Sequence, residues 1–184
     1  MKPFLSLVCV VAFLSFLSSC SSIQTSYDLD KTVDFTKFKT YAYTEEALKL
    51  PVDDLNRNRV ITAVDKELAA RGLTKSSSPD VWVDLQLKTQ QMESATATTT
   101  GGYGGYGYGR MYGYGGGMGT THIDVNKYVD GTLFINVIND NKLVWQGRGT
   151  KTIDETATPT QRDKNITSGV ASIFYNYPVK KLKK

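Results

Sequence analysis

Histidine chemistry offers the first test for catalysis in this sequence. His122 is the only histidine, and a metal site would need it clustered with further histidine, cysteine or carboxylate ligands. Asp124 lies two positions away, but that spacing is common along a strand. A Ser–His–Asp triad could assemble in space, yet no nucleophile-elbow motif accompanies His122. We therefore expect a solvated histidine near a strand end, no catalytic residue, no metal site and no bound cofactor.

The acidic side chains fit structural roles better than chemical ones. Asp53, Asp54, Asp65 and Glu67 fall at the start and on the solvated face of a predicted helix, where early carboxylates suit the helix dipole. Five further aspartates are spread over predicted strand edges and turns: Asp28, Asp30, Asp34, Asp80 and Asp84. Their spacing matches neither an EF-hand nor a glycosidase signature, so the sequence predicts no calcium site and no paired catalytic acids.

Residues 101–119, GGYGGYGYGRMYGYGGGMG, form the one chemically unusual stretch. The glycines lack the lysine of a Walker motif and the strand–helix setting of a dinucleotide fingerprint, so phosphate binding is not expected. The aromatic rings could stack on sugars or peptides, with a guanidinium adding charge. These candidate partner contacts are Tyr103, Tyr106, Tyr108, Arg110, Tyr112 and Tyr114. The alternative is a flexible insert that joins two strands and binds nothing, because so much glycine makes ordering entropically costly.

The first 20 residues have the organisation of a lipoprotein signal. Lys2 precedes an apolar run, residues 4–16, that is too short for a comfortable membrane span. The sequence LSSC at residues 17–20 follows directly and resembles the bacterial lipobox. That resemblance implies cleavage before Cys20, diacylglycerol on its sulfur and acylation of the freed amine. The alternative is an ordinary secretory signal with an incidental cysteine.

Lipid attachment would decide where the protein resides. Each buried methylene contributes about 0.8 kcal/mol, so two or three acyl chains make release from a membrane slow. Ser21 follows Cys20 with no acidic residue beside it, which favours the outer membrane by analogy with enterobacterial sorting. We expect a lipid anchor in the bacterial outer membrane with the domain facing the periplasm, and surface exposure is the alternative. The formal net charge of +4 is too modest to indicate nucleic-acid binding.

Residues 129–152 read as a central antiparallel hairpin, because two β-branched and aromatic runs flank an Asn/Asp turn. A three-residue turn, residues 140–142, would place Trp145 opposite Val137 on the apolar face. A two-residue turn, residues 140–141, would place Trp145 opposite Asn136 on the other face. We favour the three-residue turn, since a buried tryptophan needs apolar neighbours.

Two helices and three more strands complete the pattern. Residues 53–71 begin with capping aspartates and stop before Gly72, with Leu73 placed for a Schellman contact. Residues 158–177 open with a capping box from Thr158 to Gln161 and a proline at the first helical position. The expected strands are residues 35–43, residues 81–91 with an extension to 100, and residues 121–128. The expected buried stripes are Val60, Ile61, Val64 and Leu68 in the first helix, and Ile166, Val170, Ile173, Phe174 and Tyr177 in the second.

Together these elements predict an α+β fold. We expect a two-layer sandwich in which a largely antiparallel sheet of about five strands carries both helices on one face. The opposite face would present Asn136, Gln86 and Lys88 to water. The predicted boundaries are a signal peptide at 1–19, a lipidated polar tether at 20–33, one domain at 34–178 and a fraying basic tail at 179–184.

Several segments together resemble a known family. These are the lipobox, FKTYAY at 38–43, ARGL at 70–73, GTL at 131–133, LVWQG at 143–147 and a final helix running to Tyr177-Pro178. In this combination the chain resembles the domain-of-unknown-function 4136 family of bacterial lipoproteins. The resemblance implies fold and location but no activity. We expect a non-catalytic binding or structural module with an envelope protein or glycan as partner; the alternative is a hydrolase or modifying enzyme acting on envelope polymers.

Overall fold

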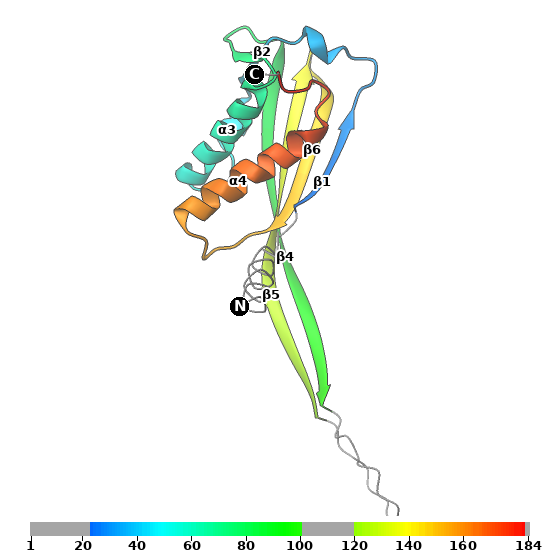
Figure 1. Ribbon diagram of the computed structural model, residues 1–184, viewed down its shortest axis with the longest axis vertical. Coiled ribbons are helices and arrows are strands. Elements are labelled where there is room, and N and C mark those ends of the chain that lie inside the picture. The colour runs from blue at the N-terminus through cyan, green and yellow to red at the C-terminus, as the bar shows by residue number, and fades with distance from the viewer. Residues whose placement is uncertain (1–22, 101–119, 183–184) are drawn as a thin grey trace, which may run out of the picture.

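The fold combines one mixed sheet with a helical layer on one of its faces, in a computed structural model that describes residues 23–100 and 120–182 (Figure 1). The strands are β1 (Gln24–Leu29), β2 (Thr40–Tyr43), β3 (Thr74–Lys75), β4 (Val81–Thr100), β5 (Thr120–Asn139) and β6 (Lys142–Thr152). The helices are α2 (Glu45–Leu48), α3 (Asp54–Ala69) and α4 (Pro159–Ile173), with 3-10 turns η1 (Phe35–Lys37) and η2 (Phe174–Asn176). The sheet order is β1-β6-β5-β4-β2-β3.

The predicted α+β fold with two helices on one face is confirmed. Helices α3 and α4 lie side by side against the sheet (Figure 1). The sheet has six strands instead of about five, because β1 and β3 were not expected and β5 joins two segments that we treated separately. It is mixed, since β2 pairs in parallel with both β3 and β4. None of the helices in the described residues is long and apolar enough to cross a membrane.

The helix boundaries follow the capping signals in the sequence. The Asp53 side chain accepts a hydrogen bond from the Asn56 N–H at the start of α3. At its end Gly72 adopts a φ of 87°, and the Leu73 N–H donates to the Leu68 carbonyl, as a Schellman motif requires. Thr158 and Gln161 form the reciprocal capping box of α4. These local hydrogen bonds satisfy helix-end groups that would otherwise lack partners.

The central hairpin pairs Trp145 with Val137 as expected, but its turn differs from the one we favour. Its turn has two residues, Asp140 and Asn141, with φ values of 48° and 60°, so the favoured three-residue turn is wrong. A bulge then shifts the register between Val137 and Ile138, leaving Val144 as the extra residue of β6. Trp145 therefore still pairs with Val137 and is fully buried.

Aromatic rings fill the core between the sheet and α4. Trp145 stacks on Phe174 with ring centroids 5.5 Å apart and meets Tyr177 edge-on at 5.0 Å. Gly147 lies beside this cluster, and the indole and Ile173 occupy the space that a Cβ would need. The predicted α4 stripe is buried from Val170 onward, whereas Ile166 is half-buried.

Two expectations about the N-terminal part of the chain were wrong. Residues 24–29, assigned to the polar tether, form edge strand β1, which pairs with β6 through the backbone and so needs no apolar alternation. Residues 35–37, assigned to a strand, form η1, because the Asp34 side chain accepts from the Thr36 N–H. Between β2 and α3 the chain forms α2, which is capped by Thr44.

The basic tail does not fray over the residues that the structure describes. Lys181 Nζ lies 2.8 Å from a carboxylate oxygen of Glu67, and the Leu182 N–H donates to the Ala70 carbonyl. Glu67 also pairs with buried Arg71, whose guanidinium donates to the Phe174 carbonyl. The tail therefore docks on the end of α3 through charge pairing.

Strands β4 and β5 continue beyond the sheet as a two-stranded ribbon (Figure 1). Pairing with β6 ends at Asp130↔Thr152, whereas β4 and β5 remain paired out to Thr100↔Thr120. The predicted polar extension of the strand to residue 100 is therefore confirmed.

Candidate functional site

The residues singled out for chemistry lie mostly outside the described part of the chain. This applies to Cys20, the predicted site of lipid attachment, and to the whole Gly/Tyr segment with its candidate partner contacts. The backbone of His122 belongs to β5 and pairs with Thr98, but its side chain is also outside the description. The expectations for these residues remain predictions.

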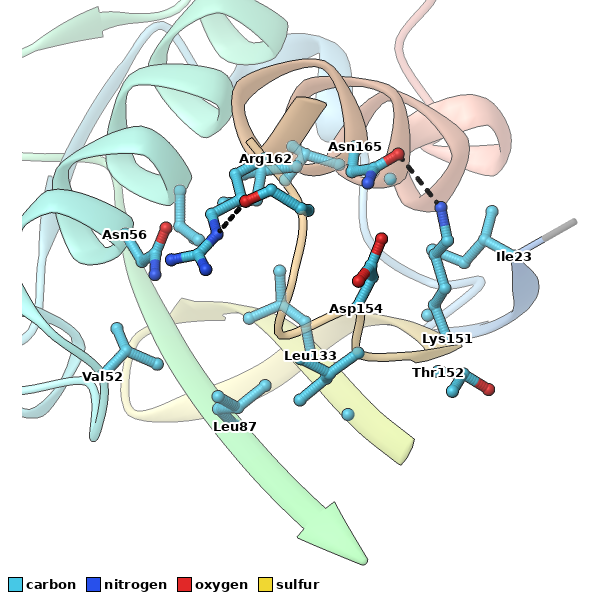
Figure 2. A pocket seen from close by; sticks show the side chains of 18 of the residues that line it. Ile23, Val52, Asn56, Leu87, Leu133, Lys151, Thr152, Asp154, Arg162 and Asn165 are labelled. Atoms are coloured by element: carbon cyan, nitrogen blue, oxygen red, sulfur yellow. Dashed lines mark hydrogen bonds between the residues drawn. The ribbon is translucent and has the colours of Figure 1, made fainter. Parts of the chain in front are cut away.

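A pocket of about 380 Å³ opens between the helical layer and the sheet (Figure 2). Its walls come from α3, α4, β4, β5, β6, the connection between α2 and α3, and the loop that joins β6 to α4. Ile23, immediately before β1, closes one side. The apolar part of the lining includes Leu50, Val60, Leu87, Leu133, Ile166 and Ile173. Its volume and apolar walls match those of sites that hold small apolar ligands or ligand segments.

Glycines on two facing elements leave room for the side chain of Ile23 at one side of the pocket. Gly149 on β6 and Gly169 on α4 both line the pocket, and neither contributes a side chain to it. Ile23 inserts between them, because a Cβ at Gly149 would lie 2.8 Å from its Cδ1 atom and a Cβ at Gly169 would lie 3.5 Å from the same atom. Helix α4 therefore packs closely on β6 at Ile173, whereas Ile23 and the pocket occupy the space beside Gly169.

Polar side chains surround the pocket and are held by hydrogen bonds to other protein groups. Lys151 Nζ lies 3.2 Å from the side-chain oxygen of Asn165 on α4 (Figure 2). The Arg162 guanidinium donates to the carbonyls of Ala157 and Glu155 at 3.0 and 2.7 Å. Lys151 thus ties β6 to α4, and Arg162 ties the loop before α4 to the helix.

The loop before α4 carries the acidic groups of the lining. Asp154 accepts hydrogen bonds from the Thr156 hydroxyl and N–H, which lower the pKa of its carboxyl below the usual value. Glu155 also lines the pocket. Lys151 and Arg162 match these two acidic groups in number, so the polar lining has no net excess of either charge.

A second ordered feature lies on the sheet face opposite α3 and α4, which we call the outer face. Asp84 and Asn136 are only 7 % and 6 % exposed there. Asn136 donates to Asp84 at 3.1 Å, and Gln146 donates to Asn136 at 2.8 Å. Thr44 and Gln86 donate to Asp84 at 3.0 and 2.9 Å. These five side chains, the polar row, cross the sheet from the end of β2 to β6. The expectation that Asn136 meets water was therefore wrong, because this row encloses it.

Aromatic and cationic side chains flank the polar row on the outer face. Trp82 is 42 % exposed, and the next residue on the same face of its strand is Asp84. Lys88 lies 5.3 Å from the centre of the Phe134 ring, and Arg148 pairs across the sheet with Phe134. The outer face thus combines fixed amides and a carboxylate with an accessible indole.

A hydrogen-bonded cluster around one carboxylate lies between α3 and the strand β2. Asp65 accepts from the hydroxyls of Tyr41 and Tyr43, both at 2.8 Å, and pairs with Lys75. Burial, then the bonds to Asp65, raise the pKa of both phenols well above the ordinary value. These phenols stay protonated as donors, so the cluster ties α3 to the sheet edge.

Sequence comparison places the chain in a family. The family model described as domain of unknown function (DUF4136) matches residues 25–179. The chain belongs to the DUF4136 family. The match includes most of β1 and extends into the docked tail. Among curated proteins, no match is found.

Solved structures resemble this DUF4136 chain to different degrees. A PDZ domain protein from Parabacteroides distasonis aligns with a TM-score of 0.50 at 14 % identity, covering 93 % of this chain and 40 % of that one. This chain therefore spans about two-fifths of that protein's length, and the likeness concerns the fold alone. Two crystal forms of the PelC dodecamer from Paraburkholderia phytofirmans align with TM-scores of 0.47 and 0.46 at 9 % identity, covering 83 % of this chain and 95 % of PelC.

The sequence predicts neither the pocket nor the hydrogen-bonded polar row of this DUF4136 domain. The alternation of β4 did indicate a polar face containing Asp84 and Gln86. The sequence gives little sign of the pocket, since Gly149 lies in the polar run GRGTKT at 147–152 and Gly169 lies far from it along the chain. Only the packing of α4 on β6 shows that the two glycines face the same space.

Proposed function

We propose that this protein is a lipid-anchored component of the bacterial envelope that binds a partner without catalysing a reaction. The anchor is the lipid on Cys20, the membrane is the outer membrane, and the domain faces the periplasm. Support comes from the apolar run at 4–16 followed by LSSC at 17–20, directly before the family domain that begins at residue 25.

The observation that carries the proposal is the preorganised polar row beside Trp82. The accessible amides of the row, Gln86 and Gln146, are held by Asp84 and Asn136 before any partner arrives, so binding would cost little side-chain entropy. An exposed indole next to fixed polar groups suits a partner with both apolar and hydrogen-bonding surface, such as a glycan or an envelope protein. We propose that the Gly/Tyr segment, with Tyr103, Tyr106, Tyr108, Arg110, Tyr112 and Tyr114, adds adaptable contacts.

The bonding of Asp84 favours a binding role over catalysis. Its two carboxylate oxygens accept hydrogen bonds from Thr44, Gln86 and Asn136. A general base needs an accessible acceptor near the proton that it removes. The acceptors of Asp84 instead hold neighbouring side chains, which is the role of an orienting group.

In-cell photocrosslinking tests the assignment of the outer face. A photoreactive phenylalanine derivative replaces Trp82, and the matched control carries it at Leu55, which is 68 % exposed on α3. We expect the residue-82 variant to capture a discrete envelope protein or glycan that the residue-55 variant does not. Equal capture at both sites, or capture at residue 55 alone, would contradict the outer face as the binding surface.

A further inference from the structure

We propose that the pocket between α4 and the sheet binds one acyl chain of the lipid on Cys20 of the same molecule. This inference rests on the lipid attachment in the proposed function and assigns an occupant to the pocket. The remaining acyl chains would stay in the membrane, so the lipid would bridge the bilayer and the domain.

The first argument is proximity along the chain. Ile23 lines the pocket, and Cys20 precedes it by three residues. Even a fully extended backbone places the two Cα atoms within about 11 Å of each other. A long acyl chain on Cys20 can therefore reach a pocket that Ile23 borders, without any rearrangement of the sheet.

The second argument is the chemistry of the walls. Leu87 and Leu133 from the sheet face Ile166 and Val170 from α4 across the pocket. An alkyl chain would gain from these walls much as it gains from lipid tails, because both surroundings remove apolar surface from water. Exchange of one chain between bilayer and pocket would therefore be close to balanced.

The third argument is the charge around the pocket. Lys151 and Arg162 are matched in number by Asp154 and Glu155, and both cations already donate to protein oxygens. A free fatty acid would bring an unmatched carboxylate to this lining. The ester-linked chains of a lipidated cysteine bring no charge, so they leave the balance of charges around the pocket unchanged.

Photocrosslinking inside the pocket gives a direct test in the native, membrane-bound protein. A photoreactive residue replaces Ile166, which lines the pocket; the control replaces Tyr175, which is 77 % exposed just beyond α4. After irradiation and proteolysis, mass spectrometry should find the residue-166 peptide joined to the acylated Cys20 peptide. We expect at least five-fold more of this product from residue 166 than from residue 175.

A pocket-filling variant supplies a second measurement that does not depend on the position of the photoreactive residue. Gly169→Leu projects into the pocket, and its Cβ would meet Ile23 at an ordinary contact distance of 3.5 Å. Leucine also suits a helix interior better than glycine, so the variant should fold. The matched control is Ser168→Leu, one position away on the exposed side of α4. Gly169→Leu should remove most of the residue-166 product, whereas Ser168→Leu should leave it unchanged.

The outcomes separate this inference from the function on which it rests. Transfer of the crosslink to a phospholipid or free fatty acid would overturn the assignment to the protein's own lipid. An acylated Cys20 peptide without any residue-166 product would overturn the pocket assignment and leave the anchor intact. A Cys20 peptide without acyl groups would overturn the lipid anchor itself, and this inference with it.

Discussion

Trp145 is fully buried against Phe174 and Tyr177, and its substitution measures how much stability one side chain supplies. We expect Trp145→Ala to lower the free energy of unfolding by about 3–5 kcal/mol, because it leaves a large cavity. Trp145→Phe should cost clearly less, since the indole N–H has no partner among the described residues and its removal breaks no bond. Urea denaturation measures both. An alanine variant within about 1 kcal/mol of the parent would contradict this packing, because truncating a buried aromatic side chain costs more than that.

Glu67 is a second residue whose environment has a measurable consequence. Burial alone would raise the pKa of its carboxyl, but hydrogen bonds from Lys181 and Arg71 outweigh burial and lower it below 4.5. We expect Glu67→Gln to cost about 1.5–3 kcal/mol at neutral pH, because it weakens charged hydrogen bonds to the buried Arg71 guanidinium.

The pH dependence of that difference follows from the lowered pKa. A carboxyl with a depressed folded-state pKa adds stability above its unfolded value of about 4.5, and loses it as the pH falls through the folded value. The gap between the parent and Glu67→Gln should therefore be constant from neutral pH to about pH 5 and close in stronger acid. Urea titrations at several pH values measure it, and a gap that widens in acid would contradict the charge pairing.

At the scale of elements, the geometry of the β5–β6 turn can be tested by substitution of one residue. Asp140 and Asn141 both have positive φ, the geometry of a type I′ turn, in which glycine is favoured at the second position. We expect Asn141→Gly to raise the free energy of unfolding by up to about 1 kcal/mol and Asn141→Val to lower it. Thermal melts compare the two variants. A stabilising valine would show that the turn has another geometry.

Helix ends were predictable from sequence, and strand details were less so. Asp53, Thr158 and Gln161 cap their helices as expected, because capping depends on residues within one turn. Strand β1 was missed because its pairing uses backbone groups and its side chains are mostly exposed. The bulge at Val144 was missed because it depends on the packing of Trp145 across the whole sheet. The pocket depends on contacts between distant elements, so one sequence could not reveal it.

The Gly/Tyr segment joins the paired ends of β4 and β5 at Thr100 and Thr120. We expect replacement of residues 101–119 by a short Gly/Ser linker to change the free energy of unfolding by less than about 1 kcal/mol, since loop-closure entropy varies slowly with length. If the tyrosines contact a partner, the same variant should lose partner capture in cells. Unfolding of the variant would show a structural role, and unchanged capture would assign the contacts to the outer face alone.

At the scale of the whole molecule, attachment is the property to test. Cys20→Ser should release the protein from the membrane fraction and abolish its labelling by a fatty acid, because no acyl chain can then be attached. Fractionation and labelling measure the two effects separately. A serine variant that still takes up the label would contradict the lipobox interpretation.

Strand β1 leads from the proposed anchor into the sheet, and its pairing with β6 determines how this connection resists a pulling force. It runs antiparallel to β6 over six residue pairs, from Gln24↔Thr150 to Leu29↔Trp145. A pull on the Gln24 end along the strand axis loads all of these pairs at once in shear, whereas a sideways pull would open them one after another. A force between the bilayer and a partner bound on the outer face would thus act on all the backbone hydrogen bonds between β1 and β6 together.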